Sequence, residues 1–138
     1  MDTEPLDPRL VKGVAYFNAG AFFDAHEVWE DLWRDCRDSA RKFYQGLIQV
    51  AVCLHHFRNR NTRGARSLYY SATSYLQRYR PVCQQIDLDR LLDELRCCCA
   101  DILADQSDRP RGSLNPDLIP QIRWTAQPSG SNRTPETT

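Results

Sequence analysis

The chain has 138 residues, of which 41% are hydrophobic and 26% charged, a composition typical of one globular domain and unlike that of disordered or fibrous proteins. Eighteen basic and eighteen acidic residues cancel to zero net charge, so no overall field attracts the chain to nucleic acid or to an anionic membrane surface. No apolar run approaches the roughly 18 residues of a membrane span, and the N-terminal residues lack a leader pattern, so we expect a cytoplasmic protein.

Two helices that form a hairpin are predicted at the start of the chain. Asp7 followed by Pro8 is typical of a helix N-terminus, and this first helix is expected to run to about Asn18. Gly20 suits the left-handed conformation at which a helix ends and the chain reverses. A second helix is expected from Ala21. One broad apolar stripe on it comprises Phe22, Ala25, Trp29, Leu32, Trp33 and Cys36.

The third predicted helix is apolar around most of its circumference. Its two neighbouring apolar stripes comprise Phe43, Tyr44, Leu47, Ile48, Val50, Ala51, Leu54 and Phe57. Such a helix does not suit a surface, so we expect it at the centre of the bundle with partners on several sides. Asp38 or Ser39 is expected to cap it. Asn61 or Thr62 is expected to cap a fourth helix, which closes before Pro81.

The character of the sequence changes after a fifth predicted helix, which opens at Asp87. Five of the eight prolines follow Asp105, and residues 127–138 are almost wholly small or polar. The sequence therefore predicts an all-α fold, a compact bundle of about five helices built from helix hairpins over residues 1–105. It also predicts an irregular segment strapped onto the bundle at residues 106–124 and a disordered tail at residues 125–138.

Polar side chains interrupt the apolar faces of the second and third predicted helices. His26 and Glu30 are four residues apart and therefore share a helix face. On the third helix, Gln45, Gln49 and His56 recur with Val52 at helical spacing. Each buried amide or imidazole left unpaired costs about 1–3 kcal/mol, so this stripe must face polar groups, water or a ligand. We expect a shared polar pocket between the two helices, lined by His26, Glu27, Trp29, Glu30, Trp33, Gln45, Gln49 and His56.

This pocket leaves two functions open. In the first, its polar groups form an internal network, and the helix hairpins present a groove to a protein partner. In the second, it binds a small molecule or a metal ion, with a hydrolase-like reaction. His26, Glu30 and His56 are candidate metal ligands, but the second histidine of a zinc-protease helix is absent. We favour the interaction module, expect no cofactor and assign no reaction class.

The six cysteines do not suggest the disulfide framework of a secreted protein. Cys97, Cys98 and Cys99 are consecutive and would point about 100° apart on a helix, so they can neither pair with one another nor match the spacing of a zinc site. We expect buried or half-buried thiols instead.

Three further groups concern the surface. Arginines cluster at the turn into the fourth helix, at Arg58, Arg60, Arg63 and Arg66. Zero net charge favours a solvated patch there over a phosphate or RNA site, and binding of nucleic acid is not expected. His55 is expected to be a core or interface histidine. A run of tyrosines exceeds what a five-helix core can cover and favours a homodimer: Tyr69, Tyr70, Tyr75 and Tyr79.

Four segments together resemble a known family. They are Phe17-Asn18-Ala19-Gly20, the run from Ala25 to Trp33, the run from Tyr44 to Gln49, and His56 with Asn61, Gly64 and Ala65. They resemble the family catalogued as domain of unknown function 309, over about residues 10–79. The resemblance implies a small all-helical domain without an established activity. It places the pocket residues except Glu30 on motif positions, together with Gly46, Asn61 and Gly64. With Gly20 of the first segment, these last three are expected to be turn and helix-packing residues.

Overall fold

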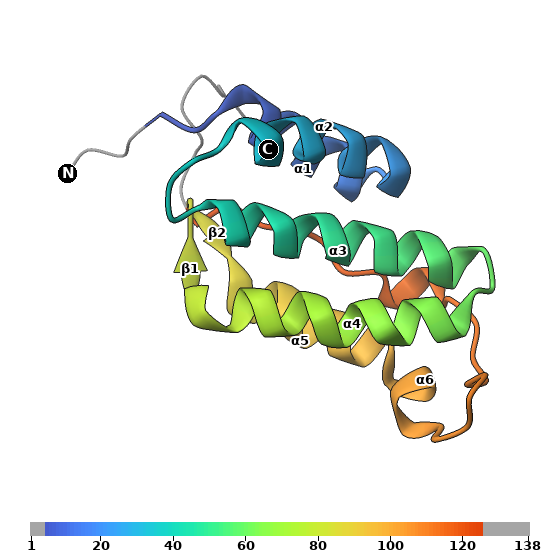
Figure 1. Ribbon diagram of the computed structural model, residues 1–138. Coiled ribbons are helices and arrows are strands. Elements are labelled where there is room, and N and C mark those ends of the chain that lie inside the picture. The colour runs from blue at the N-terminus through green and yellow to red at the C-terminus, as the bar shows by residue number, and fades with distance from the viewer. Residues whose placement is uncertain (1–4, 126–138) are drawn as a thin grey trace, which may run out of the picture.

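The computed structural model describes residues 5–125. The helices of this part of the chain are arranged in two layers (Figure 1). The helices are α1 (Pro8–Asn18), α2 (Phe22–Asp35), α3 (Arg41–Arg58), α4 (Thr62–Leu76), α5 (Leu88–Cys98) and α6 (Ala100–Ala104), with 3-10 turns η1 (Gln77–Tyr79) and η2 (Pro116–Leu118). Two short antiparallel strands, β1 (Val82–Cys83) and β2 (Ile86–Asp87), precede α5. The predicted all-α fold is confirmed.

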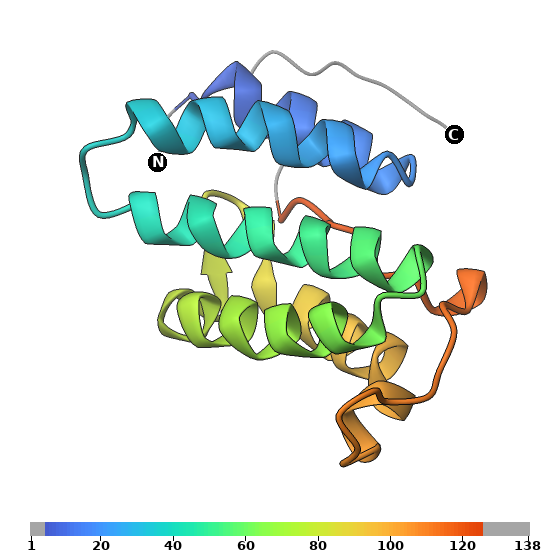
Figure 2. The same cartoon turned by 45° about the vertical axis from the view of Figure 1, so that its right-hand side comes forward.

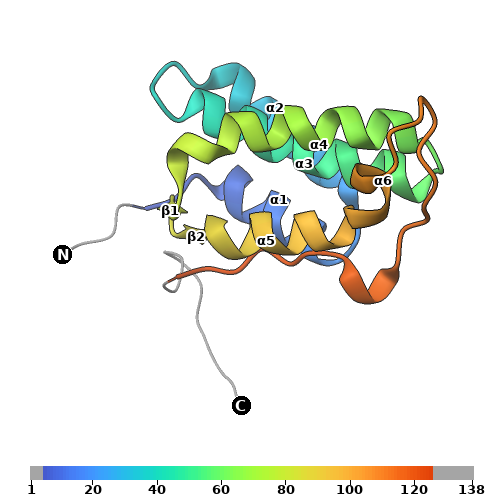
Figure 3. The ribbon, with the colours of Figure 1, turned by 90° about the horizontal axis from the view of Figure 1, so that it is seen from below.

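The first layer consists of α2, α3 and α4, which lie side by side (Figure 2). The second layer consists of α1 and α5 (Figure 3), and the last described residues run along α5 and form hydrogen bonds with both helices. The α3 helix therefore has neighbours on both sides and behind it, but its remaining face is open. We call the open side of the α2, α3 and α4 layer the outer face.

The core lies between the two layers and contains hydrophobic side chains. Its largest fully buried members include Phe17, Phe22, Trp29, Phe43 and Phe57, as the helical periodicity predicted. Among the described residues, no polar or charged residue is classed as buried. The Trp29 indole packs against α1 where Gly13 lacks a side chain, because a Cβ there would collide with the ring. The core is thus held by apolar burial, and polar groups lie at its margins.

Three of the predicted helix caps are confirmed. Asp7, Asn61 and Asp87 each accept a hydrogen bond from a backbone N–H two or three residues further on. The predicted cap of the third helix is wrong, because α3 begins after Ala40 and has no side-chain cap. The Asp38 carboxylate instead accepts the N–H of Ala40 at 2.8 Å, which keeps it within the turn before the helix.

The end of the described chain runs along α5 and α1. Ile122 is buried, and its backbone N–H and C=O both bond to the side-chain amide of Asn18, at 2.8 and 2.9 Å. Trp124 forms an isolated bridge with Ile86 of β2, a contact that the sequence did not indicate. The predicted fifth helix is interrupted at Cys99 and continues as α6. Most of the predicted tail, residues 126–138, lies outside the described residues. None of the described helices combines the length and apolar character needed to cross a bilayer.

Candidate functional site

The outer face carries nearly all the side chains that the sequence assigned to a polar pocket. Trp29 is the exception, since it is fully buried and its Nε1 donates to the Leu10 carbonyl at 3.3 Å. The others are half-buried or exposed: His26, Glu27, Glu30, Trp33, Gln45, Gln49 and His56. The expected interior location therefore does not hold. The reason is the layered fold, in which α3 is covered on three sides and this stripe points to the fourth.

The seam between α2 and α3 is aligned by contacts at its two ends. Near the hairpin turn, the Arg41 guanidinium lies 4.0 Å from the centre of the Trp33 ring. At the other end, the Phe23 ring lies 5.7 Å from His55 and 5.5 Å from His26. Because the two helices are antiparallel, these contacts set Glu30 level with Gln45, and His26 level with the turn of α3 that begins at Gln49.

The structure brings only part of the predicted set into contact. His26 Nε2 lies 3.5 Å from Glu30 Oε2, so the predicted pair on one helix face is formed. Gln45 and His56, by contrast, are eleven residues apart on one straight helix, a separation of about 16 Å at 1.5 Å per residue. They cannot line one small pocket. The polar groups form a row along α3 instead.

His56 lies at the α4 end of this row, beside the turn. Its Nδ1 is 3.4 Å from the amide nitrogen of Asn61, a group that can only donate, so Nδ1 accepts and the ring proton of the neutral form is on Nε2. Burial lowers the pKa of His56, and the neighbouring His55 lowers it further. The imidazole is thus held neutral and presents its Nε2–H as a donor.

Three polar atoms of the seam have neither solvent access nor a hydrogen-bond partner among the described residues. They are Nδ1 of His26, Nε1 of Trp33 and Oε1 of Gln49. Nε of Arg41, whose guanidinium covers Trp33, likewise has neither solvent access nor a hydrogen-bond partner. Unpaired groups of this kind cost about 1–3 kcal/mol each. Four of them along one seam call for an explanation beyond folding.

The candidate metal ligands do not assemble. Within residues 5–125, no group of three or more His, Cys, Asp and Glu side chains lies close enough to hold a metal ion. His26 and Glu30 are paired, but His56 does not complete a set with them. The described residues therefore supply at most two of the three protein ligands that catalytic zinc sites use.

The structure gives a local role to each glycine and asparagine that was expected at a turn or at a helix contact. Gly20 has a left-handed backbone, with φ of 82°, where α1 ends. A Cβ on Gly46 would meet the Leu76 side chain, so this glycine lets α3 and α4 approach closely. Asn61 caps α4 at the N–H of Gly64, 2.9 Å away. These residues fix the α3–α4 edge of the outer face.

Phe23 and Arg41 also belong to the seam, and the sequence reasoning missed both. Phe23 is 51% exposed although it is large and apolar. Its position next to Phe22 was a usable signal, because neighbouring side chains on a helix point about 100° apart and Phe23 lies outside the apolar stripe that contains Phe22. For Arg41 no signal was available, because its stacking on Trp33 joins side chains across the hairpin.

The arginine and tyrosine clusters are each divided in the structure: Arg60 and Arg63 line one cavity, whereas Arg58 and Arg66 bind separate backbone carbonyls. Arg58 donates to the Gly20 carbonyl at 2.7 Å, and Arg66 donates to the Asp105 carbonyl at 2.6 Å, so these two guanidinium groups are drawn to opposite ends of the turn region. Of the tyrosines, Tyr69 is buried, whereas Tyr70 is 55% exposed.

The cysteines are free thiols. Cys53 and Cys99 are fully buried with their sulfur atoms 4.0 Å apart, and the Cys53 thiol also lies 3.2 Å from the Ala65 carbonyl. Burial raises the pKa of Cys83 to about 11. A thiol of this kind is protonated at neutral pH and behaves as a small packed side chain.

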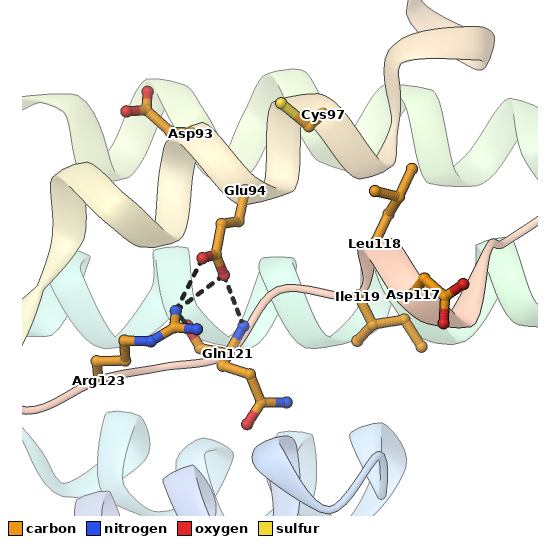
Figure 4. A pocket seen from close by; sticks show the side chains of 8 residues that line it. All are labelled: Asp93, Glu94, Cys97, Asp117, Leu118, Ile119, Gln121 and Arg123. Atoms are coloured by element: carbon orange, nitrogen blue, oxygen red, sulfur yellow. Dashed lines mark hydrogen bonds and ion pairs between the residues drawn. The ribbon is translucent and has the colours of Figure 1, made fainter.

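A second polar site lies between α5 and the last described residues (Figure 4). A cavity of about 440 Å³ is lined there by Asp93, Glu94, Cys97, Asp117, Leu118, Ile119, Gln121 and Arg123. The Glu94 carboxylate points from α5 toward Arg123, and Nη1 of Arg123 donates to its two oxygens at 2.9 and 3.0 Å. The same carboxylate also accepts the backbone N–H of Gln121 at 3.1 Å. We call this set of bonds the clasp. Both carboxylate oxygens of Glu94 accept hydrogen bonds from within the chain.

Comparisons with known proteins find similarity over the segment that contains α1, α2 and α3. The model of the domain of unknown function DUF309 matches residues 10–68, which span α1 to the first half of α4. "Uncharacterized protein YpuF" of Bacillus subtilis (strain 168) is 36% identical over 75 residues, 52% of this chain and 43% of that protein. An "Uncharacterized protein" of Aquifex aeolicus (strain VF5) is 32% identical over 68 residues, 48% of this chain and 20% of that protein. The chain thus spans less than half the length of these relatives.

Proposed function

Residues 10–68 carry domain DUF309, and from that premise we propose that the chain is a protein-interaction module whose outer face binds a segment of a partner protein. The observation that carries this proposal is the set of unpaired polar atoms on His26, Trp33 and Gln49. All three residues lie within the matched part of the chain and on the same seam.

The energetic argument starts from what these groups do for the isolated chain. A polar network that specifies a fold has its donors and acceptors satisfied, because each unsatisfied group subtracts from stability. Here the unpaired acceptor Oε1 of Gln49 and the unpaired donor Nε1 of Trp33 each lower the stability of the isolated chain. Rules of folding are broken most often at functional sites, where the loss is recovered on binding. Modest side-chain rotations would turn these groups toward an approaching partner.

The dimensions and chemistry of the face favour a polypeptide. The row from Gln45 to His56 extends about 16 Å, the length of three helical turns. Phe23 provides an exposed aromatic ring at one end, and the Arg41–Trp33 stack provides a second at the other. Aromatic and arginine side chains are the usual anchors of protein interfaces, with amides and imidazoles around them. The small-molecule and metal alternative has no comparable support from the described residues.

Site-specific photocrosslinking tests the proposal directly. A benzophenone amino acid is placed at Phe23, on the outer face, and at Leu118, which is 43% exposed beside the clasp, in cells that naturally make the protein. We expect a discrete crosslinked protein from position 23 and not from position 118. Combined His26→Ala and Gln49→Ala substitutions should reduce its yield by about tenfold or more, as loss of two buried polar contacts predicts.

Two outcomes would contradict the proposal. One is the same crosslinked protein from both positions, and the other is a crosslink at position 23 whose yield is unaffected by the double substitution. Circular dichroism of the purified variants supplies the control for folding, because both substituted side chains are only half-buried.

A further inference from the structure

A basic cavity lies at the hairpin end of the outer face, between the α2–α3 turn and the end of α4. Its volume is about 560 Å³. The side chains that line it are Ser39, Arg41, Lys42, Gln45, Arg78 and Tyr79, together with one carboxylate, Asp38. The cavity shares Gln45 with the row of polar groups along α3, and Arg41 with the seam between α2 and α3.

The three cations of this cavity lack partners of opposite charge. Arg41, Lys42 and Arg78 form no ion pair with any carboxylate of residues 5–125. The one carboxylate in the cavity is occupied, since Asp38 accepts the N–H of Ala40 at 2.8 Å and lies 3.2 Å from the Cys36 thiol. These bonds lower the pKa of Asp38. The cavity therefore holds a surplus of positive charge in a chain with no net charge.

Backbone donors at the start of α3 add to this charge. The helix has 18 residues and no side-chain cap. The N–H groups of Lys42 and Phe43 form no hydrogen bond among the described residues. Such groups, with the positive end of the helix dipole, favour anions. Arg41 lines the cavity as well, while its guanidinium stacks on Trp33.

From this arrangement we propose that the cavity binds a phosphate group. Three cations and the backbone N–H of Lys42, which also lines the cavity, match an oxyanion with two charges and several acceptor oxygens better than a single carboxylate. The cavity has room for a phosphate group carried by a larger molecule, either a small phosphate ester or a phosphorylated side chain. Phosphate binding here does not depend on the outer face taking a partner.

Titration of the isotopically labelled full chain with inorganic phosphate, at constant ionic strength adjusted with sodium chloride, tests the site by nuclear magnetic resonance. We expect saturable shifts of the Lys42 and Phe43 amide signals. Arg78→Gln should weaken binding by about tenfold, because a charge-assisted contact is lost. Arg96→Gln is the matched control, since Arg96 is exposed on α5, and it should leave the affinity unchanged. Lys42→Gln provides a second test of the same kind.

Two further titrations distinguish the source of the phosphate. Glycerol phosphate represents small esters, and a short phosphoserine peptide represents modified proteins; the ligand that binds more tightly than inorganic phosphate identifies the class. The proposal is overturned by an absence of saturable shifts with all three ligands, or by equal weakening in the Arg78→Gln and Arg96→Gln variants.

Discussion

The clasp and the seam of the outer face contain similar polar side chains and differ in whether the buried polar atoms have hydrogen-bond partners. Each brings half-buried polar side chains together from separate segments. In the clasp, Glu94 accepts hydrogen bonds from Gln121, Arg123 and Arg90. On the seam, His26 and Gln49 each keep a buried polar atom without any partner.

This difference separates two uses of polar groups within one chain. Burial alone would raise the pKa of Glu94, but the hydrogen bonds from Gln121, Arg123 and Arg90 outweigh it and lower the pKa below the usual value. The carboxylate is thus stabilised in its charged form by the fold itself. On the seam, Nδ1 of His26 and Oε1 of Gln49 have no such internal compensation in the described part of the chain, although His26 Nε2 is paired with Glu30. Satisfied polar groups hold segments of this chain together at the clasp, whereas four of the five unsatisfied buried side-chain atoms of residues 5–125 gather on the seam that we assign to a partner. The fifth is Oε1 of Gln85, between β1 and β2.

Removal of the clasp carboxylate should have the largest effect on stability. Glu94→Ala leaves the Gln121 N–H without its acceptor and the Arg123 guanidinium without its carboxylate partner, so the free energy of unfolding should fall by about 2–3 kcal/mol. Urea denaturation followed by circular dichroism measures it. Asp93→Ala is the control, because Asp93 is exposed next to Glu94, and it should change stability by less than about 0.5 kcal/mol. Equal losses in both variants would remove the distinction drawn above.

A substitution on the seam should change stability in the opposite direction. Gln49→Leu removes an acceptor that has no donor and replaces it with an apolar group of similar length, so the free energy of unfolding should rise by about 1 kcal/mol. The same denaturation experiment measures it. Gln77→Leu, at an exposed position of η1, should change stability little. A loss of stability in Gln49→Leu would show that the amide is part of a structural network after all.

The helices and much of the core could be predicted because the signals are local. Asp7, Asn61 and Asp87 cap helices through bonds that reach at most three residues, and the spacing of Phe43 and Phe57 follows from the helical period alone. Sequence reasoning could not go further with the third helix. It detected a helix apolar around most of its circumference, and inferred that partners surround it.

The direction in which the polar row points depends on segments far away in the chain. The α1 and α5 helices and the strand-like end at Ile122 cover the back of the first layer, which leaves the row of α3 open. Trp29 and Trp33 show the same limit. Both belong to one predicted stripe, yet Trp29 is fully buried whereas Trp33 is half-buried beneath Arg41. Tertiary packing, which the helical period does not encode, makes that choice.

The smallest effect we predict is a dependence of stability on pH that arises from His56. Burial lowers the pKa of this imidazole in the folded chain, with a smaller contribution from His55, so between the lowered value and about 6.5 the unfolded chain binds the proton more readily. The contribution of His56 to stability is therefore present above about pH 6.5 and is lost as the pH falls below it. Urea midpoints of the wild type should decrease between about pH 7.5 and pH 5.5.

His56→Gln keeps polar atoms near Asn61 but does not titrate, so its midpoints should decrease less over the same range. His55→Gln serves as the comparison, because it removes only the smaller cause of the shift in the His56 pKa and should retain most of the wild-type dependence. If the urea midpoints of His56→Gln follow the wild-type curve, burial of this ring does not lower the pKa of His56 enough to affect the stability of the folded chain. The α4 end of the row would then be as well hydrated as an ordinary surface, and the outer face would lose one of the features that set it apart from the clasp.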